Sequence, residues 1–146
     1  MNTANQKKVM HLDLKPLNIF LSANKNNKVE LKILNLGQNK NKDYDKYDRL
    51  YMSPQMFNVD PATRKTFADQ RADTWSLGVI LFRLMTFQLP FKDQDSICDA
   101  KIPVPFDKIN GIGFSRELVD VVKMLLKKSQ DGRPTFAHLM KVEQIE

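Results

Sequence analysis

Hydrophobic and polar positions follow two different periods along this chain. Near the N-terminus, two short runs over residues 18–21 and 29–34 are β-like, and the polar segment 24–27 between them predicts a hairpin turn. Residues 38–48 are polar and lack a helical period, which is typical of a surface loop. The chain is therefore predicted to begin with a small hairpin followed by a loop.

The next segment changes to a helical period. Apolar side chains recur at spacings of three and four over residues 73–87, which predicts a helix. They are Leu77, Ile80, Leu81, Leu84 and Met85. Because Val79 and Phe82 widen this stripe until most of the helix is apolar, we expect the helix, with Trp75, to be buried in the core.

Two further helices are predicted after the central one. The first covers 115–128, where the hydroxyl of Ser115 is a suitable cap, and the second covers 134–143. The expected fold class is therefore α+β and mainly α. It consists of a short hairpin, a long loop and helices packed around a buried central helix.

Composition narrows the class of protein. A length of 146 residues is typical of one domain, and 23 Lys and Arg against 17 Asp and Glu give a net charge of +6. The single cysteine, Cys98, excludes an internal disulfide and favours a reducing, cytoplasmic setting. No apolar run is long enough for a membrane span. Basic and aromatic residues are not interleaved, so we expect no nucleic-acid partner.

One short segment has the composition of a reactive site. Residues 11–18 place a carboxylate, an amine two residues later and an amide three residues beyond that, just before a predicted strand. These side chains, Asp13, Lys15 and Asn18, can converge on one small polar site. Such a site suits phosphoryl transfer, in which positioning and charge neutralisation do most of the catalysis.

Five segments in order resemble motifs of the eukaryotic protein kinase family, specifically those of its larger C-terminal lobe. They are HLDLKPLN at 11–18, KILNLG at 32–37, YMSPQ at 51–55, DTWSLGVILFRLMT at 73–86 and DGRP at 131–134. The resemblance implies a partial kinase-like domain over 1–146 with its catalytic loop at 11–18 and its activation segment at 35–55. A lysine two places after the aspartate is the serine/threonine pattern.

The resemblance also implies roles for individual residues. Asp13 would accept the proton of a protein hydroxyl, Lys15 would steady the transferring phosphate and Asn18 would hold magnesium. ATP and magnesium are the implied cofactors, with a site formed by Asn18, Asn35, Leu36 and Gly37. Structural roles are implied for His11, Asp73, Gln55 and Arg133, of which Asp73 would cap the backbone of the catalytic loop and Gln55 would pair with Arg133.

Several positions depart from the family pattern. Asn35 stands where the family has its magnesium-binding aspartate, so Asn18 and Asn35 would form a degenerate site of two neutral amides, whereas magnesium favours carboxylates. Asp48 replaces a threonine and is expected to compete for Lys15. Leu12 replaces an arginine, and residues 38–51 contain no serine or threonine, so control by loop phosphorylation is expected to be absent. Tyr44, Tyr47 and Tyr51 are the remaining conceivable acceptors, and we expect them to be loop or packing aromatics instead.

The segment before His11 is short. The family has a whole N-terminal lobe there, and its preceding long helix is reduced to at most residues 3–10. We expect the central helix to keep an uncovered apolar strip that makes the chain prone to aggregation or recruits a covering helix or second lobe.

Three functions stay open. The first is an active serine/threonine kinase that needs a second lobe to be supplied. The second is a pseudokinase or docking module that binds a protein through 73–85, 97–106 and 115–128. The third is a fragment of a longer kinase. A basic nucleic-acid-binding protein is the remote alternative, which salt-sensitive retention on DNA or RNA would reveal.

Overall fold

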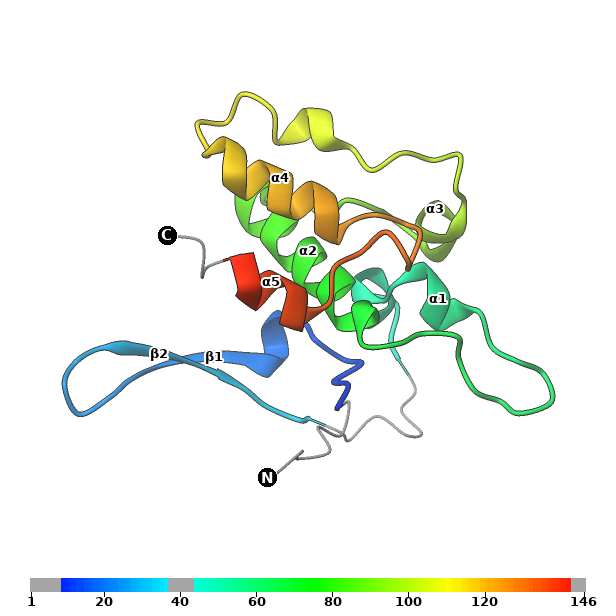
Figure 1. The fold of residues 1–146 in the computed structure, drawn as a ribbon, viewed down its shortest axis with the longest axis horizontal. Coiled ribbons are helices and arrows are strands. Elements are labelled where there is room, and N and C mark those ends of the chain that lie inside the picture. The colour runs from blue at the N-terminus through cyan, green and yellow to red at the C-terminus, as the bar shows by residue number, and fades with distance from the viewer. Residues whose placement is uncertain (1–8, 37–43, 143–146) are drawn as a thin grey trace.

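The computed structural model describes residues 9–36 and 44–142. Within these residues, one antiparallel hairpin of β1 (Ile19–Ala23) and β2 (Val29–Ile33) projects from a body of helices (Figure 1). The strands pair with Leu21 opposite Leu31. The predicted hairpin is therefore confirmed, and the fold is mainly helical as expected.

The hairpin turn is formed by the polar segment that predicted it. The side-chain Oδ1 of Asn24 accepts hydrogen bonds from the backbone N–H groups of Asn26 and Lys28, at 2.9 and 3.0 Å. An asparagine that accepts from its own following backbone stabilises a tight turn. The turn fixes the register, which continues to a 2.9 Å hydrogen bond from Leu34 N–H to the Asn18 carbonyl, so Asn18 and Asn35 both lie at the open end of the hairpin.

The core surrounds α2 (Arg71–Thr86), which is the predicted central helix. Trp75, Val79 and Phe82 have no exposed surface, and α4 (Arg116–Leu125) packs across α2 (Figure 1). The two helices meet at Gly78, where an added Cβ would lie 2.8 Å from Leu125 Cβ. A side chain at this position would push the helices apart, so the close packing requires glycine.

The predicted helix limits shift by a few residues. The central helix runs over 71–86 rather than 73–87, the next over 116–125 rather than 115–128, and α5 (Phe136–Val142) lies inside the predicted 134–143. Ser115 caps α4 as predicted, because its side chain accepts from Leu118 N–H. The side chain of Lys128 lies beyond the helix and donates to the carbonyls of Ser96 and Asp99, which explains the earlier end.

Two short helices were not predicted. They are α1 (Pro54–Phe57) and α3 (Gln94–Cys98), and α3 begins at a capping box in which Asp93 and Ser96 bond each other's backbone N–H. The expected helical face over 97–106 is wrong beyond Cys98, since the chain there is mostly irregular. Three 3₁₀ turns complete the elements: η1 (Pro16–Asn18), η2 (Asp48–Tyr51) and η3 (Phe106–Lys108).

One part of the expected buried stripe is exposed. Leu84, near the C-terminal end of α2, is 67% exposed, and the helix ends at Phe87, whose φ of 58° is left-handed and whose ring is 90% exposed. The prediction that Leu84 is buried is therefore wrong, because no described element packs against this side of the helix. The helix considered for residues 3–10 lies almost wholly outside the described residues. In the parts of the chain that are described, no helix could cross a membrane.

Candidate active site

The catalytic loop is folded by its own side chains. The 3₁₀ turn η1 brings Asn18 back over Asp13, and the Asn18 amide donates from Nδ2 to the Asp13 carbonyl at 2.7 Å and to Asp13 Oδ2 at 3.1 Å. Both side chains are buried. Two of the three residues implied as catalytic are therefore in direct contact.

Asp73 holds the loop from the start of α2. Its two carboxylate oxygens accept the backbone N–H groups of His11 and Leu12, each at 2.7 Å. Leu12 has a left-handed φ of 60°, a conformation that costs a non-glycine residue about 1–2 kcal/mol and must be held by its surroundings. Burial raises the pKa of Asp73, although these two hydrogen bonds act in the opposite direction. The expected contact between Asp73 and the loop backbone is present.

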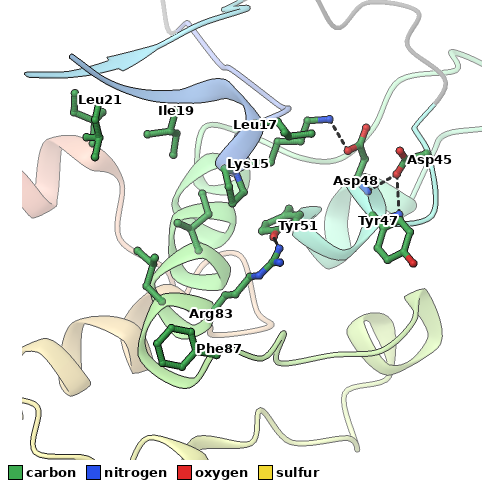
Figure 2. A pocket seen from close by; sticks show the side chains of 14 residues that line it. Lys15, Leu17, Ile19, Leu21, Asp45, Tyr47, Asp48, Tyr51, Arg83 and Phe87 are labelled. Carbon is green, nitrogen blue, oxygen red and sulfur yellow. Dashed lines mark hydrogen bonds and ion pairs between the residues drawn. The ribbon is translucent and has the colours of Figure 1, made fainter.

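Lys15 lies between two carboxylates. Its Nζ is 2.5 Å from Asp48 Oδ1 and 3.4 Å from Asp13 Oδ1, and all three side chains are largely buried. Asp48 begins η2, which positions its carboxylate against the loop (Figure 2). The expected competition of Asp48 for Lys15 is therefore seen directly, and the site has one more negative charge than Asp13 and Lys15 alone would give it.

Asn35 contacts the same loop from the end of β2. Its Nδ2 donates to Asn18 Oδ1 at 2.8 Å, and its φ of 66° is left-handed, a conformation that asparagine tolerates. The ring Nε2 of His11 bonds the Leu34 carbonyl at 2.8 Å and ties β2 to the loop. Of the other residues implied for the nucleotide site, Leu36 is exposed and Gly37 lies outside the described residues.

These residues do not fit the magnesium ion that the resemblance implies. The only acceptor atom in the Asn18 side chain already receives the Asn35 amide, and the amides supply no charge. The carboxylate that contacts Asn18, that of Asp13, is also paired with Lys15. Across the described residues, no group of three His, Cys, Asp or Glu side chains could hold a metal ion.

Gln55 and Arg133 form the expected pair at the base of the activation segment. Arg133 Nη2 donates to Gln55 Oε1 at 2.6 Å, and Gln55 Nε2 donates to the Lys128 carbonyl at 2.8 Å. Burial lowers the pKa of Arg133 to about 10. The amide thus anchors the guanidinium without neutralising it, which is the weakening expected from the loss of a carboxylate.

An apolar contact that the sequence did not reveal links the catalytic loop to the activation segment. Leu12 packs on a small cluster that includes Met52 and Met56, and Tyr44 donates from its hydroxyl to the Leu12 carbonyl at 3.1 Å. Burial raises the pKa of Tyr44. Tyr44 is therefore a packing residue, as expected, and the two segments are joined here without an arginine or a phosphate. The sequence showed only that Leu12 replaces an arginine, and its packing contact with the activation segment is visible only in the tertiary structure.

A wide groove opens beside Lys15 and has a volume of about 880 Å³ (Figure 2). It runs between the hairpin, η2 and the far end of α2. Its large apolar lining residues are Leu17, Ile19, Leu21, Leu31, Tyr47, Tyr51, Ile80, Leu84 and Phe87. Inside the groove Arg83 donates to the hydroxyl of Tyr51. The uncovered apolar strip expected on the central helix is present among the described residues, and it continues onto the hairpin.

The fold and this loop identify the class of protein. The model of the protein kinase domain family matches residues 1–145 of the chain. The chain therefore belongs to the protein kinase domain family, and the family suggested by the sequence motifs is confirmed.

Several similar curated proteins are named as serine/threonine kinases. The chain is 32% identical over 136 residues to CBL-interacting serine/threonine-protein kinase 12 of Arabidopsis thaliana, with 90% of this chain and 27% of that protein aligned. It is 30% identical over 155 residues to serine/threonine-protein kinase Nek5 of Homo sapiens, with 92% of this chain and 19% of that protein aligned. The chain spans about a quarter or less of the length of these relatives.

Proposed function

We propose that this chain is a serine/threonine-kinase-like domain whose own site is impaired in phosphoryl transfer and which acts by binding another protein. The observation that carries the proposal is the ion pair of Lys15 with Asp48. In the family mechanism that the resemblance implies, the amine of Lys15 faces the transferring phosphate. Here that amine is already held by two carboxylates.

The Asp48 carboxylate is expected to repel the transferring phosphate strongly enough to slow phosphoryl transfer. A phosphoryl oxygen near Lys15 would lie close to the Asp48 carboxylate, and two like charges about 4 Å apart repel by ~4 kcal/mol at the effective dielectric typical near a protein surface. Each ~1.36 kcal/mol is a tenfold change in rate, so this repulsion alone would slow transfer by ~10³-fold. The residues that would hold magnesium do not fit it, which removes a second source of charge stabilisation.

Single-turnover incubation tests the proposal. The full chain is mixed with labelled ATP, magnesium or manganese, and a generic basic protein substrate, and the expected result is no labelled substrate. The matched control is Asp13→Asn, which removes the implied base. Labelling by the wild-type chain that disappears in Asp13→Asn would contradict the proposal. Asn35→Asp alone is expected to stay inactive because Asp48 still holds Lys15.

The groove supports the binding half of the proposal. Leu21, Leu84 and Phe87 expose 72, 67 and 90% of their surfaces along one continuous apolar lining. Monomeric proteins rarely leave apolar patches of this kind uncovered. The occupant we propose is an amphipathic helix of a protein partner, because the large lining residues from the hairpin, η2 and α2 are aliphatic and aromatic.

Light scattering and binding of a hydrophobic dye test this half separately. The purified chain is expected to bind the dye and to self-associate, and Leu84→Glu is expected to reduce both. Asp107→Asn, a change at an exposed residue that does not line the groove, is the control and should alter neither. A monodisperse wild-type monomer that binds no dye would contradict the docking function.

A further inference from the structure

We propose that the side-chain amide of Asn35 replaces a divalent cation as the group that holds Asn18 in place, so that the catalytic loop keeps its shape without metal. The proposal concerns what supports the loop. It shares with the proposed function the observation that these residues do not fit magnesium, but its tests measure metal binding and stability, so its failure is distinguishable from a finding of phosphotransfer.

The hydrogen bonds fix the orientation of both amides. Asn18 donates from Nδ2 to two oxygens of Asp13, so its Oδ1 must point away from Asp13. Asn35 meets that Oδ1 at 2.8 Å and can bond it only as a donor, through Nδ2. The order of donors and acceptors is therefore continuous from Asn35 through Asn18 to Asp13.

In this chain of bonds, Asn35 Nδ2 takes one of the two lone pairs of Asn18 Oδ1, on the side where residue 35 would have to supply the second ligand of a cation shared by the two residues. An N–H donor and a metal ion both satisfy a carbonyl oxygen, and they cannot occupy the same position. A divalent cation would have to displace the Asn35 amide and would gain only neutral ligands in exchange. The wild-type site is therefore expected to ignore magnesium and manganese.

Exchange of Asn35 for aspartate should remove the hydrogen-bond donor to Asn18 and create a ligand for a cation. A carboxylate at position 35 has no donor to offer Asn18 Oδ1, so two acceptors face each other and the loop loses a hydrogen bond. The same two oxygens now bracket a position suited to a hard cation. Asn35→Asp should therefore be less stable than wild type without metal and should recover when metal is added.

Thermal unfolding of the full chain with and without 10 mM manganese measures both effects. We choose this concentration because it is ~100 times a weak dissociation constant of about 0.1 mM. We expect no shift in the wild-type midpoint. The Asn35→Asp midpoint should fall by about 3 °C without metal and rise by at least that amount with it. Asn35→Ala should fall without any recovery, and Asn110→Asp, an exposed change of the same charge, should behave as wild type.

Electron paramagnetic resonance measures manganese binding directly. The wild-type result does not depend on whether a variant folds, and the variants extend it. Absence of bound manganese in the wild type, together with its appearance in Asn35→Asp, is the expected result. Manganese that binds the wild type and is lost in Asn18→Ala would overturn the proposal. So would an Asn35→Asp protein that is as stable as wild type or that manganese does not restore.

Discussion

Lys15 and Asp48 form an ion pair with 2.5 Å between Nζ and Oδ1, and this contact joins the catalytic loop to the first turn of η2. Because both side chains are about nine-tenths buried, solvent screens the pair only weakly. The contact therefore gives the loop and the activation segment a shared position, and it uses a lysine that the family motif would direct at phosphate.

Asp48→Thr should open an anion site. Removal of the carboxylate takes away the closer of the two ion pairs described for Lys15, so inorganic phosphate at tens of millimolar should raise the unfolding midpoint of Asp48→Thr and leave that of the wild type unchanged. The variant should lose about 1–3 kcal/mol of stability, less than the ~3–5 kcal/mol for a fully orphaned buried charge. Asp107→Asn is the charge-matched control, and equal phosphate effects on it and on Asp48→Thr would refute the prediction.

Asp73→Asn should destabilise the chain through the catalytic loop. The His11 and Leu12 N–H groups meet different oxygens of Asp73, and asparagine replaces one of those oxygens with an NH₂ group that cannot accept. Hydrogen bonds to charged groups are each worth about 1.5–3 kcal/mol, so a loss of about 2 kcal/mol is expected in urea unfolding. A loss below ~0.5 kcal/mol would mean that Leu12 keeps its left-handed backbone without this support.

The stability difference between wild type and Asp73→Asn should also depend on pH. Burial raises the folded-state pKa of Asp73 above its ordinary value of 3.8, so the folded chain binds the proton more tightly than the unfolded chain. The contribution of this group is then complete below pH 3.8 and declines as the pH rises through the folded pKa. Urea unfolding at several pH values should show the difference shrink upward from pH 4. A difference that grows would show that the hydrogen bonds outweigh burial.

Truncation of Phe82 and truncation of Leu84 should cost very different amounts of stability, although the two residues are only two positions apart on α2. Phe82 is fully buried, so Phe82→Ala should cost about 3–5 kcal/mol. Leu84→Ala should change stability by less than ~0.5 kcal/mol because Leu84 faces the groove. Leu81 is only partly buried, and its truncation should lie between the two rather than reach the loss expected of a core residue. A large loss at Leu84 would show that the groove is covered in solution.

Phe87→Gly should stabilise the chain. Phe87 ends α2 with a left-handed φ of 58° and exposes 90% of its surface, so glycine relieves backbone strain and removes almost no packing. The greater freedom of glycine in the unfolded chain offsets part of the gain, which leaves about 0.5–1 kcal/mol. Urea unfolding measures the gain and dye binding should fall in parallel. A loss of stability would mean that the ring is packed against something in solution.

Elements with a long or distinctive local pattern were predictable. The hairpin followed from two β-like runs around a polar turn, and the buried part of α2 followed from a stripe of apolar residues that repeats over about three turns. The short helices α1 and α3 were missed because four or five residues contain too few periodic positions. The Asp93 to Ser96 capping box was a usable signal for α3, since its spacing is visible in the sequence.

The sequence by itself determined the family and indicated which residues carry the catalytic-loop motif, because both depend on residue types at fixed spacings along the chain. Through the resemblance it also indicated that Asp48 would meet Lys15. Only the tertiary structure decided that Asn35 donates to Asn18, that Leu12 joins an apolar cluster and that Leu84 lies in an open groove. Each of these depends on which segments pack together, and the direction of a side chain toward a distant partner is set by that packing rather than by local periodicity.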